Sequence, residues 1–320
     1  MIKNRILVIH HGALGDVVAT FPALLRLKKL YGSLSIICQG SIGQLAHDFN
    51  IADKWFPLEA SAFATLYSSH IDPNVKNILR SYVKVILFSR SRSLERTLSS
   101  ILENEVYGIP PRPDLDLKIH VTQHILSHLV TFRLLEKSDE DEDIASSLSV
   151  CSDRRNPQYD PSKIIIHPGS GSRKKCWPIS NFINVASSLK ADGKRPEYVL
   201  GPAEYDLHDI LVQSNRGTER VHRVDNLKDL TELVKTGNGF IGNDSGVSHL
   251  AAFMGLPTVA VFGPSDPEIW KPLGRTVRVV RSDLECSPCF EPGAVGCEEI
   301  DCFNRITPED VLGAFYELIG

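Results

Sequence analysis

The stretch Phe240–Pro264, FIGNDSGVSHLAAFMGLPTVAVFGP, predicts a strand end, a polar loop, a helix and a second strand in one unit. In the loop of small polar residues, Ser245 or Asn243 can cap a short helix expected over 247–254, which Gly255 and Pro257 end. The apolar run 258–262 is typical of a buried strand. Backbone N–H groups at the start of such a helix can bind a phosphate. The stretch therefore favours an anion-binding turn in an α/β domain, although an ordinary strand-to-helix connection has the same pattern.

The length and composition indicate a two-domain globular protein. The 320 residues are enough for two domains of about 150 residues, each with its own core. Hydrophobic residues make up 42% and charged residues 23%, which excludes a disordered or fibrous chain. The apolar run at residues 6–9 is too short for a signal peptide, and no run reaches membrane-spanning length. Since the seven cysteines also suit a reducing compartment, we expect a cytoplasmic protein.

Charge is unevenly distributed along the chain. Residues 1–136 hold 15 Lys and Arg against 11 Asp and Glu, whereas residues 137–320 hold 20 against 28, which gives a formal net charge of −4. Ordinary solvated faces can account for this asymmetry. The alternative is that the basic N-terminal half meets an acidic partner, such as a phosphorylated glycolipid or an anionic membrane surface.

The first half of the chain has the pattern of a doubly wound α/β domain. Residues 5–10 predict a strand, residues 11–16 (HGALGD) a glycine loop, and the apolar spacing from Val17 a helix. Further strands and helices are expected in alternation at 34–38, 42–49, 54–58, 74–79, 83–88 and 122–135. The loop has no G-x-G-x-x-G, which argues against dinucleotide binding. Asp16 stands at the mouth of the helix, where a carboxylate commonly caps the first turn.

Three arginines follow the strand expected at 83–88. Loops at that end of an open sheet gather ligands, so Arg90, Arg92 and Arg96 are candidates for holding phosphates of an acceptor. The alternative is that they are ordinary solvated surface arginines.

The second half begins after a polar break at 137–163, which indicates an interdomain linker with a short strand at 147–151. Residues 164–166 predict a strand that leads into HPGSGSRKKCWP (167–178). This segment combines backbone and hydroxyl donors with the positive charge of Lys175, so it has the composition of an anion site. It is not a P-loop, because G-x-x-x-x-G-K-[ST] does not fit. Later elements are expected at 179–190, 197–200 and 227–234, before a final helix that starts at Thr307-Pro308 and ends at Ile319.

Four cysteines near the C-terminus raise the question of a metal. Cys286 and Cys289 form a C-x-x-C pair, and Cys297 and Cys302 follow it. The pattern invites a zinc site, but the spacing of the second pair and the lack of a ribbon pattern argue against one.

Three segments together resemble glycosyltransferase family 9, the heptosyltransferase family of lipopolysaccharide core assembly. They are GALGDVVATFPALLRL (12–27), HPGSGSRKKCWP (167–178) and GNDSGVSHLAAFMGLPTVAVFGPSDPEIWKP (242–272). The resemblance implies a GT-B architecture, with two Rossmann-like α/β domains facing a cleft. It places an N-terminal acceptor-binding domain at 1–150, a nucleotide-sugar donor-binding domain at 160–305, and a C-terminal helix at 306–320 that packs back toward the first domain.

The resemblance also implies roles for individual residues. Asp16 matches the catalytic base, and Lys175 matches the lysine that contacts the donor diphosphate. The phosphate-binding turn and the loop for the donor sugar and phosphate are matched by Ser170, Gly171, Ser172, Asp244, Ser245 and Gly246, with His249 on the following helix. We expect contacts to the acceptor at Gly12, Arg90 and Arg92. No metal and no cofactor are implied, in keeping with the lack of a D-x-D motif.

The function that follows is an inverting, metal-independent transfer of heptose from ADP-heptose to a phosphorylated glycolipid of the lipopolysaccharide core. Such an enzyme is cytoplasmic and could contact the inner membrane peripherally, and it has no nucleic-acid partner. Three alternatives stay open: a transferase using a different nucleotide sugar, a GT-B-fold nucleotide-sugar epimerase or hydrolase, and a non-catalytic sugar-nucleotide binding protein. The presence of Asp16 argues against the last.

Overall fold

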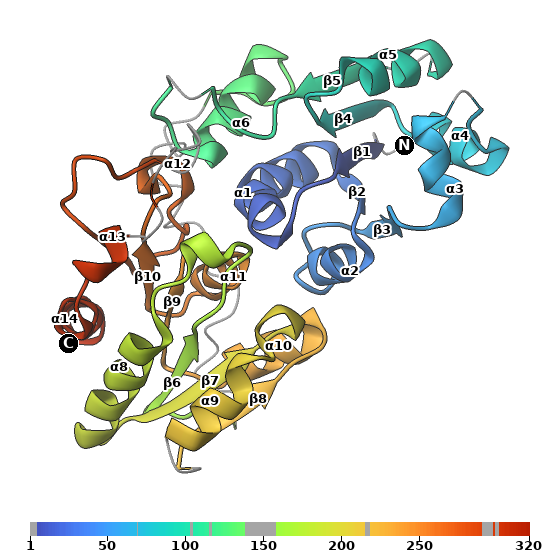
Figure 1. Cartoon of the computed structure of the whole chain (residues 1–320). Helices are drawn as coiled ribbons and strands as arrows, with labels where there is room; N and C mark the ends of the chain where they lie inside the picture. Colours follow the sequence, from blue (N-terminus) through green and yellow to red (C-terminus); the bar gives the residue numbers. More distant parts are fainter. Residues whose placement is uncertain are drawn as a thin grey trace. The chain divides into compact units, whose positions relative to one another are not determined.

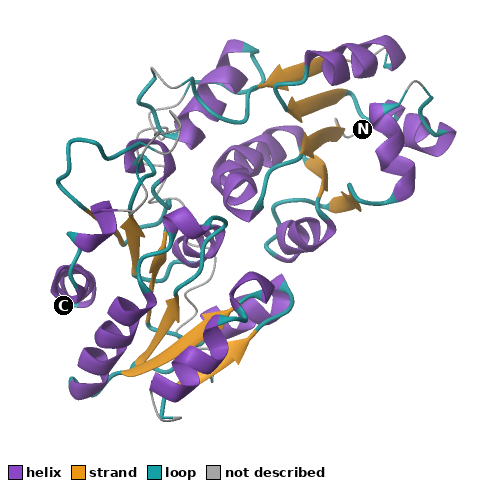
Figure 2. Ribbon diagram, viewed as in Figure 1, coloured by secondary structure: helices purple, strands orange, loops and turns teal. Residues whose placement is uncertain are grey.

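The computed structural model describes residues 5–68, 70–102, 105–114, 117–137, 158–214, 218–289, 297 and 301–320. The chain divides into two compact units, Met1–Glu142 and Asp143–Gly320. Each unit has one parallel sheet with helices lying along it (Figure 2). These two sheets confirm the predicted α/β class with parallel strands. The short strand expected at 147–151 lies outside the described residues.

The first unit is a five-stranded parallel sheet with the order β3-β2-β1-β4-β5 (Figure 1). Its elements are β1 (Arg5–His10), α1 (Leu14–Tyr31), β2 (Ser33–Cys38), α2 (Gly40–Asp48), β3 (Lys54–Pro57), α3 (Ser61–Ala64), the 3-10 helix η1 (Thr65–Tyr67), α4 (Pro73–Arg80), β4 (Lys84–Phe88), α5 (Arg92–Ile101), β5 (Glu105–Ile109) and α6 (Val121–Thr131). The inner strands β1 and β4 are fully buried along most of their length, which explains their continuous apolar sequences.

The second unit is a six-stranded parallel sheet with the order β11-β10-β9-β6-β7-β8 (Figure 1). Its elements are β6 (Lys163–His167), η3 (Arg173–Lys175), α8 (Ile179–Ala191), β7 (Arg195–Leu200), η4 (Pro202–Glu204), α9 (Leu207–Ser214), β8 (Arg220–Arg223), α10 (Leu227–Val234), β9 (Gly239–Asn243), α11 (Gly246–Phe253), β10 (Thr258–Phe262), α12 (Pro267–Trp270), β11 (Val277–Arg281), α13 (Asp301–Asn304) and α14 (Pro308–Ile319).

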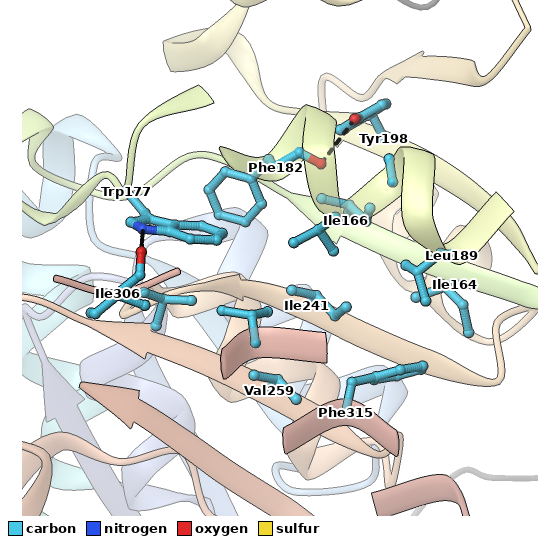
Figure 3. Packing of buried hydrophobic residues seen from close by; sticks show 14 of the residues in the cluster. Ile164, Ile166, Trp177, Phe182, Leu189, Tyr198, Ile241, Val259, Ile306 and Phe315 are labelled. Carbon is cyan, nitrogen blue, oxygen red and sulfur yellow. Dashed lines mark hydrogen bonds between the residues drawn. The ribbon is translucent and has the colours of Figure 1, made fainter. Parts of the chain in front are cut away.

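The core of the second unit joins the sheet to helices α8 and α14. Figure 3 shows Ile164, Ile241 and Val259 of three adjacent strands packed among side chains of these helices. Trp177 is 1% exposed and donates its indole N–H to the carbonyl oxygen of Ile306 at 3.1 Å. This hydrogen bond satisfies the one polar atom of a large buried side chain and fixes the segment just before α8.

The final helix, α14, begins as predicted with a hydroxyl cap. Thr307 accepts a hydrogen bond from the N–H of Asp310, whose carboxylate accepts one from the N–H of Thr307. Val311 and Phe315 are fully buried in the core of the second unit. The expected approach of this helix to the first unit stays a prediction. No described helix is long and apolar enough to cross a membrane.

Helix α1 starts earlier than the sequence predicts. It begins at Leu14 rather than Val17, so Asp16 lies in the first turn and not in the preceding loop. Pro22 consequently lies in the middle of the helix. The apolar period begins only at Val17 because the first turn carries Asp16 as a local cap rather than a buried residue.

Both sheets reverse their strand order beside the first strand of the unit. In the first unit the chain moves outward from β1 to β3 on one side and from β4 to β5 on the other. In the second unit it moves from β6 to β8 on one side and from β9 to β11 on the other. Loops leaving the carboxyl ends of the two strands at such a switch point diverge, and ligands of open α/β sheets bind there. The fold therefore points to the loops after β1, β4, β6 and β9.

Candidate functional site

The loops after β6 and β9 hold the residues predicted to bind the donor. His167 ends β6 in register with Gly242 of β9, so both loops leave the same edge of the sheet. The turn after β6 carries Ser170 and Lys175, and the loop after β9 carries Asp244. The switch point of the second unit thus joins two motifs that are far apart in sequence.

Lys175 and Asp244 form the central ion pair of this site. The ammonium nitrogen of Lys175 lies 2.8 Å from Oδ2 of Asp244, and the two side chains are only 20% and 7% exposed. Ser170 donates its hydroxyl to the backbone carbonyl oxygen of Asp244 at 2.6 Å. A charge-assisted bond between partly buried groups is stronger than a solvent-exposed pair. Three predicted donor-binding residues therefore meet at one point.

Asn243 holds the turn after β6 against the end of β9. Its amide nitrogen donates to the carbonyl oxygen of Pro168 at 2.7 Å, and its amide oxygen accepts from the backbone N–H of Trp177 at 3.0 Å. The side chain is fully buried. By bonding both ends of the turn, Asn243 fixes the backbone that presents Ser170 and Lys175. The sequence analysis gave Asn243 only as a helix-capping candidate, and this positioning role was missed.

Ser245 caps helix α11 at the same edge. Its hydroxyl accepts a hydrogen bond from the N–H of Ser248 at 3.3 Å, which confirms the predicted capping. Gly246 is the first helical residue, and His249 is 5% exposed in the first part of the helix. The first N–H groups of a helix lack intrahelical acceptors and lie at the positive end of its dipole. This end of α11 is chemically suited to an anion.

The turn after β6 requires a glycine at position 169 but has room for a side chain at position 171. A Cβ atom at Gly169 would lie 2.4 Å from the side chain of Glu204, whereas one at Gly171 would meet nothing within 4 Å. The predicted residues Gly171 and Ser172 thus lie on the open side of the turn, just before η3. The close approach that requires a glycine occurs at Gly169.

Glu204 is a carboxylic acid that the sequence analysis missed. Its carboxylate accepts the N–H of Gly201 at 3.0 Å and lies 3.9 Å from Nε2 of His167. Burial raises the pKa of Glu204, and Asp206 raises it further, against the opposing hydrogen bond from Gly201. Burial also lowers the pKa of His167 to about 4.

Asp16 lies at the switch point of the first unit. It is the third residue of α1, and its Oδ2 accepts a hydrogen bond from the N–H of Ala13 at 3.1 Å. A Cβ atom at Gly12 would lie 2.6 Å from both Asp16 and His10. The glycine therefore allows the loop to pack tightly around the carboxylate, and contact with an acceptor stays a prediction for Gly12.

Two histidines beside Asp16 were also missed. His10 is buried and accepts the N–H of Gly12 through Nδ1 at 2.9 Å; burial, aided by the neighbouring His11, lowers its pKa to about 3. His11 forms a short hydrogen bond with the hydroxyl of Tyr67 in η1. The signal available in the sequence was a pair of histidines directly after a buried strand.

The predicted acceptor-binding arginines follow β4. The guanidinium of Arg90 donates to the carbonyl oxygens of Arg112 and Pro113 at 3.2 and 3.4 Å and lies 3.4 Å from the carboxylate of Asp114. Arg90 thus holds the segment after β5. Arg92 is exposed at the start of α5. Their contact with an acceptor stays a prediction.

The metal question was tested on the described residues. Among them, no three His, Cys, Asp or Glu side chains are placed to hold a metal ion. In the part of the chain that the structure describes, Cys286, Cys289, Cys297 and Cys302 form no disulfide. Metal-independent chemistry itself stays a prediction.

Comparisons with known proteins agree on one family. The profile of glycosyltransferase family 9 (heptosyltransferase) matches residues 117–296. The chain is similar to lipooligosaccharide heptosyltransferase 2 of Campylobacter jejuni, with 29% identity over 156 residues, or 46% of this chain and 48% of the relative. It is also 30% identical to lipopolysaccharide heptosyltransferase 2 of Escherichia coli over 114 residues, or 33% of this chain and 32% of the relative. The matches thus span about half, or less, of the curated relatives' length.

Solved structures match over almost the whole chain. A family 9 glycosyltransferase from Veillonella parvula superposes with a TM-score of 0.74 at 18% identity, covering 99% of this chain and 97% of the other. An Escherichia coli heptosyltransferase with ADP gives a TM-score of 0.69 at 15% identity, covering 98% and 99%. At these identities the likeness establishes the fold, and it confirms the predicted match to GT-B heptosyltransferase structures.

Proposed function

The chain belongs to glycosyltransferase family 9, the heptosyltransferase family, and from this premise we propose that it is an inverting, metal-independent glycosyltransferase. The proposed reaction moves heptose from ADP-heptose to an acceptor sugar of a lipopolysaccharide core. The names of the relatives support this substrate class, since they are lipopolysaccharide and lipooligosaccharide heptosyltransferases. The structural relative with ADP supports the nucleotide.

One observation of this chain carries the proposal. Lys175 and Asp244 meet at the switch point of the second unit, beside the N-terminus of α11. A lysine, hydroxyl donors and a helix N-terminus together suit the diphosphate of a nucleotide sugar. The carboxylate of Asp244 adds an acceptor for sugar hydroxyls, which a site for phosphate alone would not need.

The proposed chemistry is a single displacement. An acceptor hydroxyl attacks the anomeric carbon as the bond from that carbon to the diphosphate oxygen breaks, and ADP leaves. Asp16 takes the hydroxyl proton as general base. Lys175, the turn Ser170–Ser172 and the start of α11 at Ser245 and Gly246 stabilise the charge that develops on the diphosphate. Attack opposite to the leaving group inverts the anomeric configuration.

The acceptor is proposed to be a phosphorylated glycolipid bound by the first unit. Arg92 is exposed two residues before the buried Leu94 of α5, and Arg90 precedes it in the loop after β4. Guanidinium groups bind phosphates in a bidentate manner. Binding of a glycolipid acceptor would bring the protein into peripheral contact with the inner face of the cytoplasmic membrane.

The experiment combines genetics with reconstitution. Mass spectrometry of lipopolysaccharide from a deletion strain identifies the missing sugar, and the truncated oligosaccharide recovered from that strain is the acceptor probe. Purified protein with ADP-heptose should then release ADP and add one heptose to the probe, with an inverted anomeric centre by NMR. Wild-type lipopolysaccharide in the deletion strain, together with no transfer in vitro, would overturn the proposal.

The same assay separates the alternatives. Addition of another sugar from a different nucleotide donor would identify a transferase of different donor specificity. Consumption of donor without the acceptor would indicate a hydrolase or epimerase. Tight binding of donor with no turnover under any condition would indicate a binding protein.

A further inference from the structure

His11 and Tyr67 form a polar and aromatic pair at the switch point of the first unit. His11 directly follows β1, whose last residue His10 lies in register with Phe88 at the end of β4. Nε2 of His11 is hydrogen-bonded to the hydroxyl of Tyr67, and the two ring centroids lie 5.7 Å apart at 59°. The pair connects the loop between β1 and α1 to the 3-10 helix η1.

The surrounding packing turns the ring of Tyr67 outward. Phe63 and Leu66 on the same segment are 5% and 1% exposed and belong to the core of the first unit. Thr65 ties η1 to the start of α4 by accepting the N–H of Asp72 at 3.0 Å. With its neighbours anchored inward, Tyr67 keeps 59% of its surface exposed.

The neutral form of His11 can hold Tyr67 in place by a hydrogen bond. Burial lowers the pKa of His11, and the backbone of Phe88 opposes this shift only in part. A neutral imidazole has one nitrogen that can accept a hydrogen bond, so Nε2 of His11 can accept one from the hydroxyl of Tyr67. The ring is therefore held by a hydrogen bond at its hydroxyl while 59% of the surface of Tyr67 remains exposed.

An exposed aromatic ring that is held in place suits a sugar. Tyrosine offers a large rigid surface at little cost in conformational entropy, and the apolar C–H face of a sugar ring packs on such a surface. His11 adjoins Gly12, and Gly12 packs directly against Asp16 in the first turn of α1. A sugar placed on Tyr67 would thus have its hydroxyls close to the proposed base.

We propose that Tyr67 is an acceptor-binding residue, whose ring stacks on a sugar of the acceptor saccharide, and that His11 is the residue that positions it. This inference rests on the proposed glycosyltransferase function and adds a subsite on the first unit. Recognition by stacking would favour a saccharide over a free phosphate or a simple alcohol as the group that binds here.

The test measures binding and turnover separately. The probe is the water-soluble oligosaccharide recovered from the truncated lipopolysaccharide of a deletion strain. By calorimetry, Tyr67→Ala should raise its Kd about five- to tenfold. Tyr67→Phe should raise it less, and about as much as His11→Ala, because the ring remains but the hydrogen bond that positions it is lost. The Kd for ADP should stay unchanged in both. His11→Ala should raise the acceptor KM with little change in kcat, and His11→Gln should restore it in part because its amide oxygen can accept from Tyr67.

Matched controls exclude a general loss of stability. Leu30→Ala removes another exposed apolar side chain of the first unit, and Tyr107→Phe removes another hydrogen-bonded phenol hydroxyl. Neither should change the Kd of the oligosaccharide, and all variants should keep the melting temperature within a few degrees. If the wild type elongates the oligosaccharide but Tyr67→Ala binds it normally, this inference is wrong and the proposed function stands. If the wild type neither binds nor elongates it, both fail.

Discussion

Lys175 lies 2.8 Å from Asp244, so a cation of the turn after β6 is held by an anion of the loop after β9. The pair bridges the two strands at which the second sheet reverses its order. A diphosphate bound at this switch point would interact with the Lys175 ammonium while Asp244 remains beside it. The ion pair therefore keeps Lys175 in position before the donor binds, and it reduces the cost of ordering a flexible side chain on binding.

Lys175→Ala should weaken the binding of ADP about tenfold or more. A partly desolvated diphosphate gains roughly 1.5 to 3 kcal/mol from each charge-assisted hydrogen bond. Calorimetry with ADP measures the loss directly. Lys190→Ala is the matched control, since Lys190 of α8 pairs with Glu219 at 3.3 Å. Unchanged ADP affinity in the Lys175 variant would remove this residue from the donor site.

Asp244→Asn should discriminate between the sugar and the nucleotide. The amide keeps the shape of the side chain but removes the charge that holds Lys175, and it weakens hydrogen bonds to sugar hydroxyls. We expect the affinity for the nucleotide sugar to fall about five- to fiftyfold while the affinity for ADP changes less. Calorimetry with both ligands on one protein preparation gives the comparison. An equal loss for the two ligands would contradict a role in sugar binding.

Turnover should survive chelation, because the proposed leaving-group stabilisation comes from Lys175, the Ser170–Ser172 turn and the start of α11. The assay is ADP release after dialysis against EDTA. The double variant Cys286→Ser, Cys289→Ser serves as a second arm and should retain turnover. A loss in EDTA that one defined metal restores would contradict the prediction and return attention to the four cysteines.

A buried ionic network connects strands β6, β7 and β8 through Lys163, Glu197 and His222. The carboxylate of Glu197, 1% exposed, lies 2.6 Å from the ammonium of Lys163 and 2.8 Å from Nε2 of His222. Burial alone would raise the pKa of Glu197, but the hydrogen bonds from His222 and Lys163 outweigh it and lower the pKa to about 2.

This network predicts a pH dependence of stability. Because the pKa of Glu197 is lower in the folded chain than its ordinary value of 4.5, the carboxylate stabilises the fold above about pH 4.5. That contribution, on the order of 3 kcal/mol, should be lost as the pH falls from 4.5 toward 2. Urea unfolding of the wild type and Glu197→Gln across this range measures it. The variant should show a shallower slope, whereas the exposed Glu232→Gln should match the wild type; equal slopes in all three would refute the assignment.

The sequence predicted the architecture better than the site. Strands such as 5–10 and 258–262 agree with the structure because they are buried on both faces, so their composition is continuously apolar. Helix α5 and strand β5 were missed, since β5 is only half-buried and its apolar signal is weak. The start of α1 was misplaced because its first turn is set by a local cap rather than by apolar spacing.

Within the candidate site, local motifs were predictable and their partners were not. Lys175 and Ser170 belong to a recognisable turn, but their contacts with Asp244 follow from the neighbouring positions of β6 and β9. Glu204 leaves no motif, since its importance comes from packing against Gly169 across two strands. Contacts that depend on sheet order lie beyond what spacing along one chain can predict.

Asp16 poses the clearest question, because its observed contact and its proposed role differ. Its Oδ2 accepts the N–H of Ala13, which is a helix-capping interaction. A cap and a base predict different consequences for the same substitution.

Asp16→Asn separates the two roles. If Asp16 is the general base, kcat should fall about 10²- to 10⁴-fold while the affinity for ADP and the melting temperature stay nearly unchanged, because the amide oxygen of Asn can still accept the N–H of Ala13. If Asp16 only caps the helix, the Asp16→Asn variant should keep its turnover and Asp16→Ala should lose little of it. Asp16→Ala should then lose about 1 kcal/mol of stability. The chain offers a matched control in Asp310, which occupies the same third position of α14 and accepts the N–H of Thr307 at 2.9 Å. Asp310→Asn and Asp310→Ala make the same change to a helix cap outside the site. A loss of kcat that is confined to the Asp16 variants would identify Asp16 as the base. Near-normal turnover in Asp16→Asn would rule that assignment out.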